Sequence, residues 1–323
     1  TGVPRSIFEA ADSLATNVRA RVLAIGNPDD PSSYFAEVCK PGSGWHVIRI
    51  SAFDTPAYTD EEVPDTLNDL LISKQWVEER KKRWGIGSPI YQSKVLGLFP
   101  EISDDTLLMP RQIREAQERD TKDAVHLLAG KMGVDVARFG EDFTAIYRAQ
   151  GGRVRLVKTM HKADTMETAE FVNFHLMAAP EEYANIDVIG VGGGVYDRCR
   201  QLGAKVREFN SSNRAYDHER FGNRRAECYW HLRDLADRQE LDLPPIGQDD
   251  ELIAQLGSIR WKLMNGKIYI ESKEEMKQRG LPSPDRADAV VMALAEGPNI
   301  VAFDLTESEA DRTPTSGLRD RPM

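Results

Sequence analysis

The sequence predicts an α/β protein whose main unit is a mixed β-sheet flanked by helices. Three strand-like apolar patterns follow one another from residue 131 onward, and alternating helical and strand patterns come after them. Gln150-Gly151-Gly152 separates two of these strands and is typical of a hairpin turn. A three-stranded meander continued by alternating helices and strands gives a mixed sheet with helices on both faces.

Length and composition limit the class of protein. The chain has 323 residues, which suggests two domains, and it is 41% apolar and 29% charged, close to a soluble globular average. No apolar run approaches the roughly 18 residues of a membrane helix, and no signal-peptide pattern is present, so we expect a protein that is neither in a membrane nor secreted. Three scattered cysteines argue against a zinc site or a disulfide framework. The first residue is Thr1, so we expect the start of the natural chain to be missing.

The first hundred residues predict a small α/β segment. Apolar runs at 19–25 and 45–50 predict strands, and helices are expected at 32–38, 73–84 and 88–98. Ser32 or Ser33 can cap the first of these helices, and Gly85 and Gly87 end the second. Residues 105–130 are polar and charged, with one helix expected after Pro110. They predict a linker between a first unit at 1–104 and a second at 131–300.

The second unit is predicted element by element. We expect strands at 131–136, 143–149, 153–158, 185–191 and 205–209, helices at 164–177, 195–202, 220–238, 249–257 and 284–295, and a hairpin at 260–270. Asn265-Gly266 is the strongest hairpin signal in the chain. Ser283 is expected to cap the last helix, with Pro284 at its first position. Residues 301–323 are polar and contain proline, which predicts a disordered tail.

Four acidic residues of this unit lie where carboxylates are uncommon. Asp135 and Asp187 fall within apolar strands, and Asp288 lies in an apolar helix with Asp285 on the same face. Carboxylates that converge repel one another and stay ionised only when a cation lies between them. Oxygen ligands without Cys or His favour Mg²⁺ or Mn²⁺, and two such ions can cleave a phosphodiester. Each acid alone also has a structural explanation, as a turn, edge or helix-start residue.

Basic residues are concentrated in one part of an acidic chain. The net charge is −10, but residues 198–233 contain nine Lys/Arg against four Asp/Glu, a net +5. We expect phosphate contacts from this segment and from the hairpin, through Arg214, Arg220, Arg224, Arg225, Lys262 and Lys267. The alternatives are a solvated helix face paired with Glu219 and Glu227, and a hairpin that extends the sheet with lysines guarding its edge.

Three passages that carry these acids resemble the nuclease domain of the large terminase subunit of tailed bacteriophages. They are GVDVARFGEDFTAI (133–146), IDVIGVGGGVYDR (186–198) and SPDRADAVVMAL (283–294), and the resemblance covers roughly 131–297. It implies an RNase H-like fold and metal-dependent cutting of concatemeric DNA during genome packaging. It also implies that Asp135, Asp187 and Asp288 are catalytic metal ligands and that Asp285 is an auxiliary ligand or proton handler. Asp187 stands where some relatives have glutamate.

The first hundred residues resemble the end of the same family's ATPase domain. TGVP (1–4) is similar to the sequence after the Walker B acids, and LAIGNP (23–28) to the motif that couples hydrolysis to DNA movement, with Asn27 its polar sensor. The chain contains no G-x-x-x-x-G-K-[ST] loop to cradle nucleotide phosphates, so we expect a partial P-loop-type segment that does not hydrolyse ATP. ATP would be a cofactor only of the full-length protein.

The resemblance also implies partners and a place of action. These are double-stranded DNA, a portal protein and the small terminase subunit, in the cytoplasm of an infected bacterial host. A homo-oligomeric ring is implied only for the full-length motor.

The favoured mechanism is two-metal hydrolysis. Asp135 bridges the two ions, Asp187 and Asp288 each hold one, and Asp285 assists. Another RNase H-like nuclease such as a resolvase is an alternative, although the ATPase-like passage argues against it. A non-catalytic portal-docking module is a second alternative, in which the acids are only structural. An actin-like ATPase is a weaker one, because the chain lacks a second glycine-rich phosphate loop.

Overall fold

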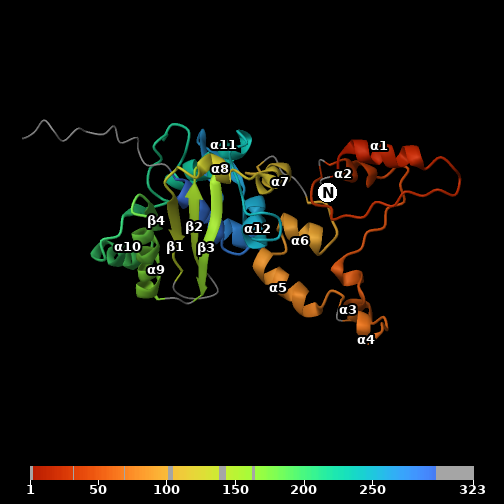
Figure 1. Cartoon of the computed structure of the whole chain (residues 1–323), viewed down its shortest axis with the longest axis horizontal. Coiled ribbons are helices and arrows are strands. Elements are labelled where there is room, and N and C mark those ends of the chain that lie inside the picture. Colours follow the sequence, from red (N-terminus) through yellow and green to blue (C-terminus); the bar gives the residue numbers. More distant parts are fainter. Residues whose placement is uncertain are drawn as a thin grey trace, which may run out of the picture.

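The computed structural model describes residues 3–31, 33–68, 70–100, 105–137, 143–161 and 164–295. The β-sheet and its helices lie at one end of the molecule and the first helices at the other (Figure 1). The tail predicted for 301–323 lies outside the described residues. No helix in the described ranges is long and apolar enough to cross a membrane.

The described part of the first hundred residues contains helices and irregular chain but no strand. The helices are α1 (Arg5–Leu14), α2 (Tyr34–Val38), η1 (Ala52–Asp54), α3 (Pro56–Thr59), α4 (Asp65–Asn68), α5 (Lys74–Trp84) and α6 (Pro89–Lys94). The α/β prediction was therefore wrong here, and the runs at 19–25 and 45–50 leave Leu23 82% and Ile48 72% exposed. A strand needs a neighbour to pair its backbone and bury its side chains, and none lies beside these runs in the described chain.

The helices predicted in this segment correspond to α2, α5 and α6, although α6 ends at Lys94 and not at Leu98. Ser33, Ser73 and Ser88 each accept a hydrogen bond from a first-turn amide of α2, α5 and α6. Gly85 ends α5 at a φ of 78°.

The main sheet has five strands and confirms the predicted mixed α/β class. The strands are β1 (Lys131–Asp135), β2 (Phe143–Gln150), β3 (Arg153–His161), β4 (Tyr183–Asp187) and β5 (Val206–Phe209). Their order is β3-β2-β1-β4-β5, in which β1 pairs antiparallel with β2 and parallel with β4. The turn between β2 and β3 has Gly151 at a φ of 57°, which accounts for glycine there.

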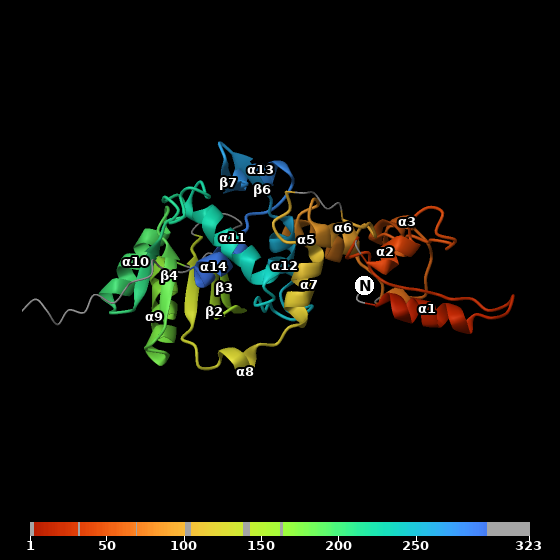
Figure 2. The same cartoon turned by 90° about the horizontal axis from the view of Figure 1, so that it is seen from above.

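Helices cover both faces of the sheet (Figure 2). Helices α9 (Thr165–Ala178) and α10 (Gly192–Gln201) pack on Met132 and Val134 of β1. Gly133 points to the opposite face, where a Cβ atom would lie 2.0 Å from the Ala289 carbonyl oxygen. Helix α14 (Asp285–Leu294) therefore lies directly against β1, backed by α11 (Arg224–Asp237) and α12 (Asp250–Ser258). Because side chains alternate along a strand, Asp135 points to the α14 face as Gly133 does.

The segment expected to be a linker contributes to the packed core. It forms α7 (Pro110–Glu118) and α8 (Lys122–Val125), and Leu107, Leu108 and Ile113 are buried in the large cluster around α11 and α14. Helices α5 and α6 in turn pack on α12, where Ala254 joins a cluster with Trp84 and Tyr91. The described residues on both sides of position 104 therefore share packed contacts.

The predicted hairpin is present as β6 (Trp261–Met264) and β7 (Lys267–Ile270). Asn265 and Gly266 have φ values of 51° and 74°, as a two-residue hairpin turn requires. The hairpin forms a two-stranded sheet of its own, so it does not extend the main sheet. A short helix that we did not predict, α13 (Lys273–Gln278), connects it toward α14.

Candidate metal centre

Two acidic residues end neighbouring parallel strands. Asp135 is the last residue of β1 and Asp187 the last of β4, and the preceding residues Val134 and Ile186 are register partners. The carboxyl ends of parallel strands meet at one edge of a sheet, so both side chains start from that edge. Asp135 is 6% exposed and Asp187 is half-buried.

Strand β4, which carries Asp187, ends earlier than predicted. It stops at Asp187 instead of Val191, because the chain turns back toward α10 there. A Cβ atom on Gly192 would lie 1.7 Å from the Asp187 carbonyl oxygen, so only glycine fits this turn. The glycine-rich passage therefore allows the close backbone approach that places Asp187 at the end of its strand.

The other two acids lie in the first turn of α14. Asp285 accepts a hydrogen bond from the Phe143 amide (3.4 Å) and another from the Ser283 hydroxyl. The predicted capping by Ser283 was wrong, because Pro284 occupies the cap position and makes no side-chain cap. Asp288 is one helical turn beyond the cap, and its amide donates to the Pro284 carbonyl (2.8 Å).

A lysine that the sequence analysis missed lies among these carboxylates. The Lys273 Nζ atom is 3.2 Å from Asp288 Oδ2, 3.5 Å from Asp285 Oδ1 and 3.9 Å from Asp135 Oδ2. Lys273 is the first residue of α13, whose start is a capping box between Ser272 and Glu275. That S-x-x-E pattern is visible in the sequence and would have predicted the helix, although not its neighbours.

Asp288 is held by two residues of α11. Tyr229 donates its hydroxyl to Asp288 Oδ1 (2.7 Å), and Arg225 lies 3.4 Å from the same oxygen. Arg225 also donates to the Glu271 carbonyl oxygen (2.6 Å), and its side chain is only 13% exposed. Arg225 was expected to contact DNA, but its side chain lies against the acidic cluster.

Burial and mutual repulsion govern the protonation of these acids. Burial, together with the carboxylates of Asp288, Asp285 and Asp187, raises the pKa of Asp135 well above its usual range, although Lys273 opposes this. Burial also raises the pKa of Asp187. Burial acts in the same direction on Asp288, but Arg225 and Lys273 outweigh it and lower its pKa.

The charge balance of the cluster favours a bound cation. Four carboxylates face two cationic side chains, Lys273 and Arg225, which leaves a deficit of two positive charges when all four acids are ionised. Carboxylate oxygens without Cys or His are the donor set that suits Mg²⁺ or Mn²⁺. The residues present therefore fit a divalent ion in chemistry and in charge.

The carboxylates are not arranged as a ready-made metal cage. Among the described residues no group of three or more His, Cys, Asp and Glu side chains is close enough to hold an ion. The Lys273 ammonium lies between them instead. A divalent ion bound by these acids would take over the neutralising role of this lysine.

The remaining predicted site residues lie apart from the acids. Arg214 and Arg220 are exposed, and Arg220 stacks over Phe221 and Trp230. Arg224 pairs with Glu227, and Lys262 with Glu275. Lys267 is half-buried on β7, and Asn27 is exposed in irregular chain.

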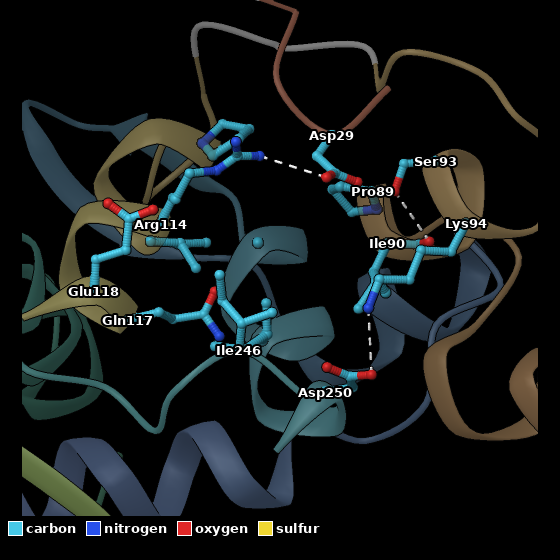
Figure 3. A pocket seen from close by; sticks show the side chains of 14 residues that line it. Asp29, Pro89, Ile90, Ser93, Lys94, Arg114, Gln117, Glu118, Ile246 and Asp250 are labelled. Carbon is cyan, nitrogen blue, oxygen red and sulfur yellow. Dashed lines mark hydrogen bonds and ion pairs between the residues drawn. The ribbon is translucent and has the colours of Figure 1, made fainter. Parts of the chain in front are cut away.

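A hollow lies in another part of the described chain. It has a volume of about 300 Å³ and lies between α6, α7 and α12, with Pro89, Ile113 and Ile253 among its walls (Figure 3). Ion pairs from Arg114 to Asp29 (3.5 Å) and from Lys94 to Asp250 (3.3 Å) cross its rim. None of the four clustered acids lines it, so the candidate metal centre and the hollow are separate features.

The strand order and the position of the acids define the class of fold. A sheet of order β3-β2-β1-β4-β5 with acids at the ends of β1 and β4 and at the start of α14 is RNase H-like. Among solved structures, the chain is similar to the nuclease domain of the large terminase subunit gp2 of bacterial virus Sf6. That match has 22% identity and a TM-score of 0.52, and it covers 60% of this chain and 100% of that domain.

Two further solved structures also match the chain, one of them more weakly. A mutant of the Sf6 domain with manganese and beta-thujaplicinol matches with the same identity, coverage and TM-score. The large terminase nuclease from thermophilic phage G20c with bound magnesium matches at 13% identity and a TM-score of 0.40, over 51% of this chain and 79% of that one. No protein-family model matches the chain, and no curated protein matches it. The likeness to the Sf6 domain shows that the sheet unit of this chain has the same fold as that domain.

Proposed function

We propose that the chain is a divalent-metal-dependent DNA endonuclease of a phage genome-packaging motor, which cuts concatemeric double-stranded DNA. The observation that carries the proposal is the acidic cluster. Asp135, Asp187, Asp285 and Asp288 lie at one edge of an RNase H-like sheet with more negative charge than their cationic neighbours balance. The similar Sf6 domain was solved with manganese, which supports a divalent ion as the missing charge.

The proposed chemistry is two-metal hydrolysis with Mg²⁺ or Mn²⁺. Two divalent ions, when bound, activate a water for in-line attack and stabilise the leaving 3′ oxygen. Asp135 would serve both ions, Asp187 and Asp288 would serve one each, and Asp285 would assist. Arg225 and Tyr229 keep Asp288 ionised and fix its orientation (2.7 Å from the Tyr229 hydroxyl). Lys273 neutralises the acids until the ions arrive.

DNA would be held by basic side chains outside the acidic cluster. We propose Arg214, Arg220 and Lys267 as phosphate contacts, with Arg224 and Lys262 available if their pairs with Glu227 and Glu275 open. Arg225 is better assigned to Asp288 than to DNA. We further propose portal, small-subunit and ring contacts, ATP coupling through Asn27 and action in the host cytoplasm. They rest on the sequence resemblance.

Plasmid cleavage tests the proposal. The purified chain is incubated with supercoiled plasmid in Mn²⁺, Mg²⁺ or EDTA, beside Asp135→Asn and the control Asp197→Asn, which changes an exposed acid on α10. We expect metal-dependent nicking or linearisation that Asp135→Asn abolishes and Asp197→Asn retains. DNA binding, measured by fluorescence anisotropy in Ca²⁺, should survive in both variants. Cleavage that persists in Asp135→Asn, or wild-type protein that binds neither Mn²⁺ nor DNA, would overturn the assignment.

A further inference from the structure

The acidic turn of α14 lacks a cap of its own. Pro284 occupies the cap position and has no side-chain hydrogen bond to offer the first-turn amides. Helix α12 supplies the missing partner, because Gln255 Oε1 accepts a hydrogen bond from the Ala287 amide (3.0 Å). The same side chain donates from Nε2 to the Ser283 carbonyl oxygen (3.3 Å). One amide group from another helix thus bridges the two sides of the turn that contains Asp285.

A half-buried arginine makes a second link between these helices. Arg286 lies between Asp285 and Asp288 in sequence, but its guanidinium points away from them to Asp249 Oδ1 (2.7 Å) and to Glu251. Asp249 caps α12 at the Leu252 amide (3.2 Å) and accepts the Tyr147 hydroxyl (2.5 Å). The Asp249 side chain is 2% exposed and Tyr147 is fully buried on β2. Arg286 therefore ties the acidic turn to α12 and to the centre of the sheet.

Helix α12 is itself firmly held. Leu252 and Leu256 are fully buried, and Ala254 packs against the cluster of α5 and α6. Lys94 of α6 pairs with Asp250 at 3.3 Å. Figure 2 shows α12 between α14 on one side and α5 and α6 on the other, in agreement with its packing contacts. A fixed helix can hold a neighbouring turn in one orientation.

We infer that Gln255 and Arg286 are positioning residues, through which α12 holds the carboxylates of α14 in the geometry that a divalent ion needs. The inference rests on the proposed function, because it takes these carboxylates to be ligands of a divalent ion. Metal ligands must be held within about 0.5 Å of their working positions, and supporting contacts provide this. Removing Arg286 would also leave the buried Asp249 carboxylate without its cation.

The test uses four variants of the whole chain. Gln255→Leu removes both hydrogen bonds at similar volume, and Gln248→Leu is its control on the exposed loop before α12. Arg286→Gln removes the charge, and Arg286→Lys restores it without the forked geometry. Mn²⁺ affinity is measured by titration calorimetry, and hydrogen exchange of the peptide covering 283–294 is followed by mass spectrometry. Circular dichroism identifies the folded variants, and only these are compared.

We expect Gln255→Leu to weaken Mn²⁺ binding about 5- to 10-fold, as loss of a helix cap of roughly 1 kcal/mol implies, and to speed exchange in 283–294. Gln248→Leu should change neither, and Arg286→Lys should recover part of the loss seen in Arg286→Gln. If Arg286→Gln does not fold, the results for Gln255→Leu and Arg286→Lys still test the positioning role. A folded Gln255→Leu whose Mn²⁺ affinity and exchange both match the wild type would overturn the inference.

The exchange measurement separates this inference from the proposed function. If the wild-type chain binds no Mn²⁺, the proposed function fails. Faster exchange in 283–294 would then still establish that α12 holds the turn. If the wild type binds Mn²⁺ and Gln255→Leu leaves exchange unchanged, the positioning role fails and the proposed function stands.

Discussion

Replacing Lys273 by methionine should tighten the binding of a divalent ion at the acidic cluster. The lysine ammonium is within 3.9 Å of three carboxylates, so it occupies the region from which an ion would be coordinated. Methionine keeps most of the unbranched apolar stem, is one atom shorter, and removes the charged ammonium with its hydrogen-bond donors. The variant therefore isolates the electrostatic competition between the ammonium and the ion.

The size of the effect follows from Coulomb's law with solvent screening. Unit charges about 4 Å apart interact by about 4 kcal/mol at an effective dielectric constant near 20 and by about 1 kcal/mol in water. Because the Lys273 side chain is 46% exposed, we take a value near the aqueous limit, about 1–2 kcal/mol of repulsion toward the ion. A tenfold change in affinity is about 1.4 kcal/mol, so Lys273→Met should bind Mn²⁺ about 5- to 30-fold more tightly.

Titration calorimetry with Mn²⁺ at fixed pH and ionic strength measures this affinity. Lys277→Met is the matched control, because Lys277 is exposed on the same helix and has no carboxylate of the cluster among its ion-pair partners. The apo form of Lys273→Met should also unfold more easily than the wild type, since burial and repulsion then act on the acids without their main counter-charge. A folded Lys273→Met that binds Mn²⁺ no more tightly than the wild type would refute the reasoning.

Three further predictions test other parts of the structure. Tyr229→Phe removes the hydroxyl that donates to Asp288 at 2.7 Å, and it should reduce metal-dependent cleavage several-fold in initial-rate assays. Tyr216→Phe, the control at an exposed position, should leave the cleavage rate unchanged. Gly133→Ala would place a Cβ atom 2.0 Å from the Ala289 carbonyl oxygen, so the free energy of unfolding of this variant in urea should fall by about 2 kcal/mol or more. An unchanged midpoint of urea unfolding would contradict the close packing of α14 on β1. Burial raises the pKa of the Cys199 and Cys228 thiols to about 12, so at pH 8 a disulfide reagent should label the half-buried Cys39 first and the other two only after denaturation.

Local patterns in the sequence were sufficient for most of the sheet unit. Alternating or apolar runs bounded by glycine predicted the five strands, and Asn265-Gly266 predicted the hairpin, because turn geometry depends on the residues of the turn itself. The same logic failed at 19–25 and 45–50, where the apolar pattern is present but the described chain offers no strand to pair with. A strand forms its backbone hydrogen bonds only with a neighbouring strand, whereas a capped helix forms them within itself.

The four acids could be chosen from the sequence because carboxylates in apolar strands and helices are uncommon. The cationic residues that surround these acids, Arg225 and Lys273, could not be identified from the sequence. Arg225 lies 63 positions from Asp288, and its local context on a basic helix suggested DNA contact, whereas the structure buries it against a carboxylate. Lys273 lies in a short charged segment that resembles any exposed helix start.

The sequence by itself determined the class of fold, the succession of strands along the chain and the choice of acidic residues, since these depend on short-range periodicity and on residue chemistry. Only the tertiary structure decided that Lys273 lies among the acids, that Arg225 and Tyr229 hold Asp288, and that α12 supplies the cap that α14 lacks. The physical reason is that a side chain's charge state and orientation depend on what packs against it. Those neighbours come from distant parts of the chain, which no local pattern specifies.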